Sequence, residues 1–179
     1  MLIFLNFDGV LHPNAVRFEK KINPVLDAPR HCLFESNDAL AEVIENFPTV
    51  RLVLNTWWTY FLGIDESLRR LPKTLSSRVI GSTLQHASSY QDLPHRIAIA
   101  TKAVSNVTEP VLILDHIDAR YSEHVLHIAL LLEPQIGLAD SRAVHALLRL
   151  ISRAAETSEV RIDRSTETIN WTNQADSSF

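Results

Sequence analysis

The sequence predicts an α/β protein of the Rossmann-like kind, with a central, mostly parallel sheet and helices on both of its faces. Short apolar runs alternate along the chain with segments whose apolar residues recur at helical spacing. The runs are apolar at nearly every position, as strands that are covered on both faces require. Several runs end at an acidic or amide residue, which indicates a polar edge where ligands of such sheets bind.

The first half of the chain is expected to contain buried strands with a helix between them. Leu2–Phe7 is an apolar run that ends at a turn signal, Asp8-Gly9. Three prolines between residues 12 and 35 favour a loop or a short hairpin. Ser36 suits a helix N-cap, and Pro48 stops the helical spacing that follows it. The next expected elements are a strand at Val50–Leu54, helical stretches around Tyr60–Leu71 and Lys73–Ser77, and a strand at Arg78–Gly81.

The second half repeats this alternation. Leu93–Val107 has helical spacing, with a proline that a first turn tolerates. The apolar runs Val111–Leu114, which ends on Asp115, and Val125–Leu132 are expected to be strands. Asp140–Ala154 has the apolar stripe of an amphipathic helix. We therefore expect one domain over residues 1–154 and a polar tail over residues 155–179, either a strap lying on the domain or disordered.

Composition argues against several classes of protein, although it does not exclude a nucleic-acid partner. The net charge of −4 gives no global basic field for nucleic acid or anionic membrane, although a local phosphate site needs only one or two cations. Cys32 is the only cysteine, which excludes an internal disulfide and suits a reducing compartment. The N-terminus lacks the features of a signal peptide, and no apolar run is long enough to cross a bilayer. A cytoplasmic protein with no membrane partner is expected.

Polar residues follow the ends of three expected strands. Singly, each acid is most simply a turn residue or a helix cap. Together they form a polar rim at one edge of the sheet, where a ligand site is expected. These rim residues are Asn6, Asp8, Asn55, Thr56, Asp115 and Asp118.

The same segments carry a resemblance to a known superfamily. Leu5–Pro13 (LNFDGVLHP) resembles the first motif of the haloacid-dehalogenase-like (HAD-like) superfamily, and Val53–Trp58 is similar to the second. Arg96 stands where the superfamily keeps a lysine or arginine, and Leu112–Asp118 resembles the fourth motif. Four motifs in the correct order over residues 1–152 identify the chain as a member, with a Rossmann-like HAD fold.

The resemblance implies magnesium-dependent hydrolysis of a phosphomonoester. In active relatives the first aspartate attacks phosphorus, and Asn6 occupies that position here; the second, Asp8, is the general acid and base. The resemblance further implies that Mg²⁺ is held at Asn6, Asp8, Asp115 and Asp118, and that the phosphate is held by Asn55, Thr56 and Arg96. Phosphoryl transfer depends on such positioning and charge neutralisation.

Asn6 is the main departure from the superfamily pattern. A carboxamide cannot form an acyl-phosphate, and the loss of a covalent nucleophile typically costs about a million-fold in rate. It also removes one charge from the metal site, which weakens Mg²⁺ binding. Asn6 is either an engineered trap or a natural change. Asn55, His116 and Thr59 also depart from the pattern, which favours natural divergence.

Two functions therefore stay open for the chain. One is a HAD-like phosphatase whose turnover is impaired; the alternative is a non-catalytic module that binds a phosphorylated ligand or a protein. A purely scaffolding domain is a third possibility. The segments between the motifs show no obvious separate cap domain. A site without a cap resembles that of members that act on large substrates such as phosphoproteins or polynucleotide ends.

Several other residues are ambiguous. His12 follows the first motif and is either a phosphate contact or a loop-filling residue. Trp57 and Trp58 either stack on a substrate ring or pack in the core. Lys102 is the alternative to Arg96 as the phosphate cation, but it lies nearly two turns into the expected helix.

The histidines do not form a convincing metal set. His124 and His127 fall in the expected strand Val125–Leu132 or directly before it, where a spacing of three points side chains to opposite faces. We therefore expect packing or edge positions for both.

Overall fold

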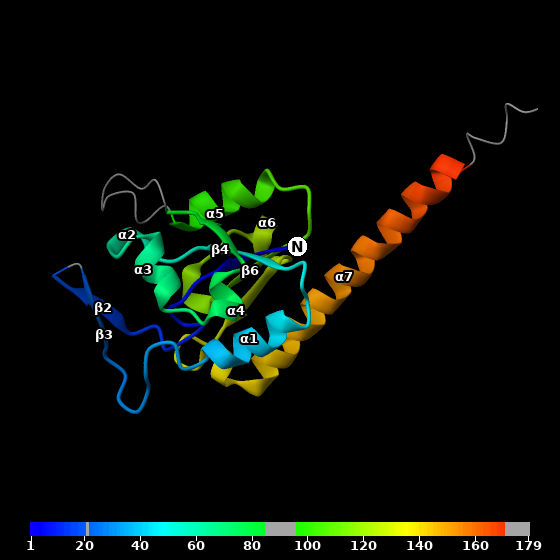
Figure 1. The fold of residues 1–179 in the computed structure, drawn as a ribbon. Helices are drawn as coiled ribbons and strands as arrows, with labels where there is room; N and C mark the ends of the chain where they lie inside the picture. The colour runs from blue at the N-terminus through cyan, green and yellow to red at the C-terminus, as the bar shows by residue number, and fades with distance from the viewer. Residues whose placement is uncertain (21, 85–95, 171–179) are drawn as a thin grey trace, which may run out of the picture.

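The computed structural model describes residues 1–20, 22–84 and 96–170, with side chains described as far as residue 156. Its centre is a five-stranded sheet in which every strand pairing is parallel. The strand order is β5-β4-β1-β6-β7. Figure 1 shows the sheet at the centre of the domain, between the helices. The strands are β1 (Leu2–Leu5), β4 (Arg51–Leu54), β5 (Val79–Ser82), β6 (Val111–His116) and β7 (Ala129–Leu132).

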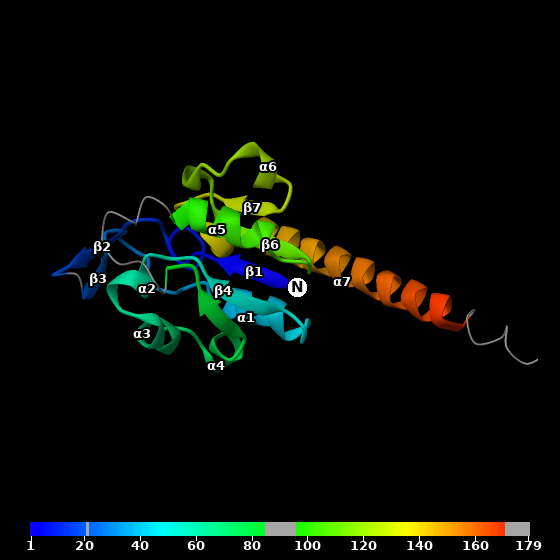
Figure 2. The same ribbon diagram turned by 90° about the horizontal axis from the view of Figure 1, so that it is seen from above.

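Helices cover both faces of this sheet, as predicted. In β1, Ile3 and Leu5 face one layer, whereas Leu2 and Phe4 face the other. This explains why the strand is apolar at every position. Helices α1 (Asn37–Glu45), α4 (Lys73–Ser76) and α7 (Ser141–Asn170) contribute to the first layer. Helices α5 (Arg96–Ser105) and α6 (Glu123–Leu126) contribute to the second (Figure 2).

The strand order reverses at β1, and the polar rim lies at this switch point. The chain passes from β1 to β4 and β5 on one side and then returns to β6 on the other. Just beyond β1, the backbone N–H of Asn6 donates to the carbonyl of Leu114 at 3.0 Å. On the opposite side, the N–H of Asn55 donates to the carbonyl of Leu5 at 2.7 Å. The carboxyl ends of three strands therefore lie side by side at the switch point, where ligands bind in open α/β sheets.

A small hairpin lies beyond this edge of the sheet. The segment expected to be a loop or a hairpin contains the antiparallel pair β2 (Val16–Glu19) and β3 (Asn23–Leu26) (Figure 1). The short helices α2 (Trp58–Phe61) and α3 (Ile64–Arg69) follow β4. Within the described ranges no separate cap domain is inserted between the elements.

The prediction of a strand over Val125–Leu132 was partly wrong. The chain forms helix α6 first, and β7 begins only at Ala129. An apolar run of this length does not distinguish a strand from a buried helical turn, and Ser122 starts the helix at its N-cap position. His124 and His127 therefore lie on and directly after α6, not on a strand, and both are exposed.

Of three predicted helix ends, the start of α1 is confirmed, the start of α5 is untested and the end of α7 differs. Ser36 is the N-cap residue of α1, but its buried hydroxyl caps nothing and has no partner in the described part of the chain. Helix α5 is described from Arg96, and the predicted start at Leu93 lies outside the described residues. Helix α7 begins at Ser141 and continues to Asn170, beyond the expected end at Ala154. The domain boundary after residue 154 stays a prediction.

Among the described helices, none combines the length and the apolar character needed to cross a bilayer.

Candidate functional site

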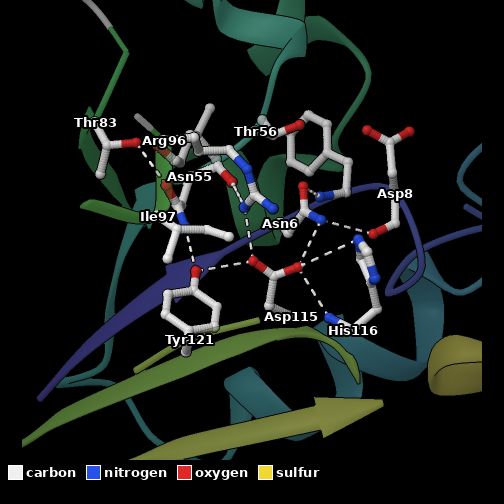
Figure 3. A network of polar contacts seen from close by, with 12 residues as sticks. Asn6, Asp8, Asn55, Thr56, Thr83, Arg96, Ile97, Asp115, His116 and Tyr121 are labelled. Carbon is white, nitrogen blue, oxygen red and sulfur yellow. Dashed lines mark hydrogen bonds and ion pairs between the residues drawn. The ribbon is translucent and has the colours of Figure 1, made fainter. Parts of the chain in front are cut away.

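The loop after β1 brings Asn6 into a network of hydrogen bonds at the switch point. Its amide nitrogen Nδ2 donates to the backbone carbonyl of Asp8 at 2.7 Å and to Oδ1 of Asp115 at 2.8 Å (Figure 3). Its Oδ1 accepts the backbone N–H of Phe7 at 2.9 Å. Asn6 is buried, so these three bonds fix the direction in which each end of the amide points.

Asp115 is the centre of this network and is completely buried. Its Oδ1 accepts the Asn6 amide and the backbone N–H of His116, the latter at 2.9 Å. Its Oδ2 accepts Arg96 at 2.6 Å and the hydroxyl of Tyr121 at 2.9 Å. Two donors on each oxygen satisfy the carboxylate without water or metal, as a buried charge requires.

Arg96 supplies the positive charge of the site. It opens α5, is 5% exposed, and also donates from Nη1 to the backbone carbonyl of Asn55 at 2.8 Å. Burial alone would lower the pKa of Arg96, but the charge and hydrogen bond of Asp115 outweigh it, and the pKa is raised. The guanidinium carbon lies 5.6 Å from the centre of the Trp57 ring. Its Nε is buried without a hydrogen-bond partner in the described ranges.

Asn55 and Tyr121 complete the network on the side of β4. Asn55 is fully buried; its amide donates to the Tyr121 hydroxyl at 2.8 Å, and its Oδ1 accepts the hydroxyl of Thr83 at 2.7 Å. Burial and the neighbouring charge of Asp115 raise the pKa of Tyr121 far above its ordinary value. The tyrosine therefore stays a hydrogen-bond donor to Asp115.

Asp8 is held from one side and open on the other. Its Oδ1 lies 3.1 Å from Nε2 of His12 and accepts the indole N–H of Trp58 at 3.2 Å. The other ring nitrogen of His12 accepts the backbone N–H of Phe34, so the proton of a neutral His12 is on Nε2 and donates to Asp8. The side chain of Asp8 is 11% exposed. Figure 3 shows its carboxylate pointing away from Asp115.

Two glycines allow the first loop to pack closely between its neighbours. Gly9 has a φ of 72°, and a Cβ there would lie 2.7 Å from Cβ of His116. Gly137, in the short 3-10 helix Gly137–Ala139, has a φ of 57°, and its Cβ would lie 2.4 Å from the carbonyl oxygen of Val10. Both positions combine a left-handed backbone with a contact that excludes any side chain.

A hollow of about 400 Å³ opens next to Asp8. Three of its lining residues are aromatic, and one is a cation on β2 of the hairpin. The lining consists of Asp8, Asn14, Val16, Arg17, Phe18, Trp57 and Phe61. The Phe18 and Phe61 rings stack on each other with centroids 4.3 Å apart. The hairpin and α2 therefore form an aromatic wall beside the polar network.

The structure brings together most, but not all, of the predicted site residues. Asn6, Asp8, Asn55, Arg96 and Asp115 are joined by the contacts above. Thr56 is buried beside them, where its hydroxyl accepts the N–H of Trp58 at 3.4 Å, near the start of α2. Asp118 is exposed and instead lines a separate hollow of about 650 Å³, together with Lys102.

Three residues that the sequence left ambiguous or did not indicate complete the site. Tyr121 contacts Asp115 only because the turn Ile117–Ala119 folds back after β6, and no local pattern signals this. His12 supports Asp8 rather than standing free for a phosphate. Trp58 is a core residue whose indole N–H also positions Asp8, whereas Trp57 lines the hollow.

The contacts of the site do not fit a resident Mg²⁺. Asp118, which the resemblance also assigns to the ion, lines a separate hollow. The other oxygens assigned to the ion are those of Asn6, the Asp8 carbonyl and Asp115. The last two accept the Asn6 amide, and the Asn6 oxygen accepts a backbone N–H. Within the described ranges, no group of three or more His, Cys, Asp or Glu residues is arranged to hold a metal ion.

The strand order, the switch point and the residues gathered there are those of a HAD-like domain. Over residues 2–143 the chain matches the family described as the HAD domain in Swiss Army Knife RNA repair proteins. Because the match covers most of the chain, the chain belongs to this family, and the resemblance seen in the sequence is confirmed. None of the curated proteins or solved structures compared with the chain matches it.

Proposed function

We propose that this domain binds the terminal phosphate of an RNA strand and holds it without forming a covalent intermediate. The observation that carries the proposal is the Asn6 amide at the position of the nucleophile. A carboxamide carries no negative charge, and the lone pair of its nitrogen is delocalised, so it cannot form the acyl-phosphate intermediate. Here the Asn6 nitrogen also donates both of its hydrogens to neighbouring oxygens, and the Asn6 oxygen accepts a backbone N–H. The ancestry is that of a HAD-like hydrolase, but the usual route to turnover is closed.

Arg96 is the proposed contact for the phosphate. Its Nη1 is used by Asp115 and the Asn55 carbonyl, but its Nε has no partner in the described part of the chain. A buried guanidinium with an unused donor favours an anionic oxygen acceptor. The Trp57 ring below the guanidinium limits how far the side chain can move.

The hollow beside Asp8 supports a nucleic-acid ligand. Bases stack on aromatic side chains without regard to sequence, and Trp57 with the Phe18–Phe61 pair offers such faces. Arg17 on the hairpin also borders the hollow, but its guanidinium is paired with Glu19 and Asp27, so the aromatic faces, and not this cation, favour RNA. The family is named for RNA repair proteins, which favours RNA over a phosphoprotein. The net charge of −4 does not oppose this, because these contacts are local.

A second candidate is slow hydrolysis in which water attacks the phosphorus directly. Its support is Asp8, whose carboxylate is oriented by His12 and Trp58 and borders the hollow. Asp8 would take a proton from the attacking water while the ester P–O bond breaks, and the leaving oxygen would take a proton from solvent. This route needs no nucleophile at Asn6.

The test is a pair of measurements on short single-stranded RNA with 5′-phosphate, 3′-phosphate or hydroxyl ends. Fluorescence anisotropy should show that one phosphorylated end binds about 10-fold more tightly than the hydroxyl end, a difference of roughly 1.4 kcal/mol. Trp57→Ala should weaken all three RNAs about 10-fold while keeping the preference for that end. Single-turnover assays should show no phosphate release by the unmodified domain.

Each outcome separates the candidates. Equal affinity for phosphorylated and hydroxyl ends contradicts a phosphate site. Phosphate release that Asp8→Ala abolishes supports direct hydrolysis instead of binding alone. The Asn6→Asp variant is compared in the same assay: if it gains no activity, the lost nucleophile is not the only obstacle to turnover.

A further inference from the structure

The nitrogen of Asn6 lies between the two oxygens that a metal ion would share. Nδ2 is 2.7 Å from the carbonyl oxygen of Asp8 and 2.8 Å from Oδ1 of Asp115. An amide nitrogen carries two hydrogens, and here each of the two oxygens accepts one of them. The amide therefore bridges a carbonyl and a carboxylate, which are the oxygen types that Mg²⁺ prefers.

The orientation of this amide is fixed by its other end. Oδ1 of Asn6 accepts the N–H of Phe7 at 2.9 Å. Turning the amide over would break all three bonds and place Oδ1 against two other acceptor oxygens. In a buried position, lost bonds and facing acceptors carry a substantial free-energy cost. While the network is intact, the amide therefore presents its nitrogen, not its oxygen, to the Asp8 carbonyl and Asp115.

The positive charge of Arg96 partly replaces the charge that a divalent ion would bring to the site. Arg96 forms an ion pair with Asp115, with both side chains almost fully buried. Tyr121 and the His116 N–H donate to the remaining positions of the carboxylate. A cation entering here would have to displace these donors in addition to losing its own water.

We infer that the domain has no resident Mg²⁺, and that the Asn6 amide and the Arg96 guanidinium take the place of the ion at this site. Ligand binding at the site is then independent of divalent cations. The inference concerns the same site as the proposed function but requires no RNA ligand, because cation binding is measured on the domain alone.

The experiment uses Mn²⁺, which takes similar oxygen ligands, and follows its binding by electron paramagnetic resonance. The unmodified domain should leave Mn²⁺ free at millimolar concentration. Asn6→Asp restores a carboxylate between the same oxygens and should bind one Mn²⁺ at least about 10-fold more tightly than the unmodified domain. Asn106→Asp is the matched control: it adds the same charge at an exposed position after the C-terminal end of α5, outside the site, and should behave like the unmodified domain.

Thermal unfolding gives a second readout that does not depend on the Mn²⁺ signal. Without a cation, the new carboxylate of Asn6→Asp faces the Asp8 carbonyl and Asp115, so its midpoint should fall by about 5 °C in EDTA and recover in Mg²⁺. The midpoint of the unmodified domain should be the same in EDTA and in Mg²⁺.

The inference is overturned by stoichiometric Mn²⁺ binding to the unmodified domain, or by an increase in its midpoint with Mg²⁺. It is equally overturned if neither the unmodified domain nor Asn6→Asp binds Mn²⁺, since the amide would then not be what excludes the ion. Binding by Asn106→Asp equal to that of Asn6→Asp would also overturn it, because added charge alone would then explain the result.

Discussion

Replacing Arg96 by methionine tests whether the buried ion pair holds the site together. The guanidinium and the Asp115 carboxylate lie 2.6 Å apart, with side chains 5% and 0% exposed. Unit charges about 4 Å apart interact by roughly 4 kcal/mol at the effective dielectric constant that describes protein sites. Removing one partner of a buried pair costs about 3–5 kcal/mol, because the other charge is left without compensation. Asp115 keeps three hydrogen-bond donors in Arg96→Met. We therefore expect the free energy of unfolding to fall by about 3 kcal/mol, near the lower end of this range.

The assay is urea denaturation followed by tryptophan fluorescence, with Arg51→Met as the matched control. Arg51 pairs with Glu109 on the surface, and its side chain is 49% exposed. An exposed pair contributes about 0–1 kcal/mol, so the control should unfold almost as the unmodified protein does. In the double variant Arg96→Met, Asp115→Asn, the free energy of unfolding should fall by less than the sum of the falls in the two single variants. Equal losses for Arg96→Met and Arg51→Met would refute the reasoning.

Three more predictions test the close packing and the buried donors. Gly137→Ala should lower the free energy of unfolding, measured by urea denaturation, by at least about 2 kcal/mol more than Gly63→Ala does. Both glycines have a positive φ, but of the two only Gly137 faces a backbone oxygen. Equal losses would contradict the close approach at Gly137. The pKa of Tyr121 is raised in the folded state, so its contribution to stability is complete below the ordinary value of 10.0 and is lost as pH rises above it. The urea midpoint of Tyr121→Phe should therefore fall less steeply with pH above about 10 than that of the unmodified protein. An equal slope would mean that Tyr121 is not the source of this pH dependence. Trp58→Phe removes a fully buried N–H donor to Asp8 and should cost about 1–3 kcal/mol in the same assay; a loss within error would mean that this bond adds nothing.

The strands and the polar rim were predictable because their signals are local. Leu2–Leu5 and Val111–Leu114 are apolar at every position since both faces of the sheet are covered, and the polar residue that follows each run marks its carboxyl end. The parallel arrangement then brings Asn6 and Asp115 together without further information.

The parts that could not be predicted depend on contacts between distant segments. The run Val125–Leu132 satisfies the pattern of a strand throughout, yet its first residues form a helix because Val125 alone faces the core there. Tyr121 is an ordinary tyrosine in the sequence, and its role follows only from the turn that carries it to Asp115. His12 could have been read as a free ligand until its two ring nitrogens were seen to be occupied.

Two of the departures from the superfamily pattern, Asn6 and Asn55, act on one carboxylate. Asn6 donates directly to Asp115, and Asn55 donates to Tyr121, which donates to Asp115 in turn. Both changes therefore add amide hydrogens where the superfamily pattern pairs a buried carboxylate with a divalent cation. A buried carboxylate that has lost its cation needs such donors, since its oxygens are not solvated. A single engineered change at Asn6 would not account for the amide at Asn55, so the arrangement favours divergence of the whole site over one substitution in an active enzyme.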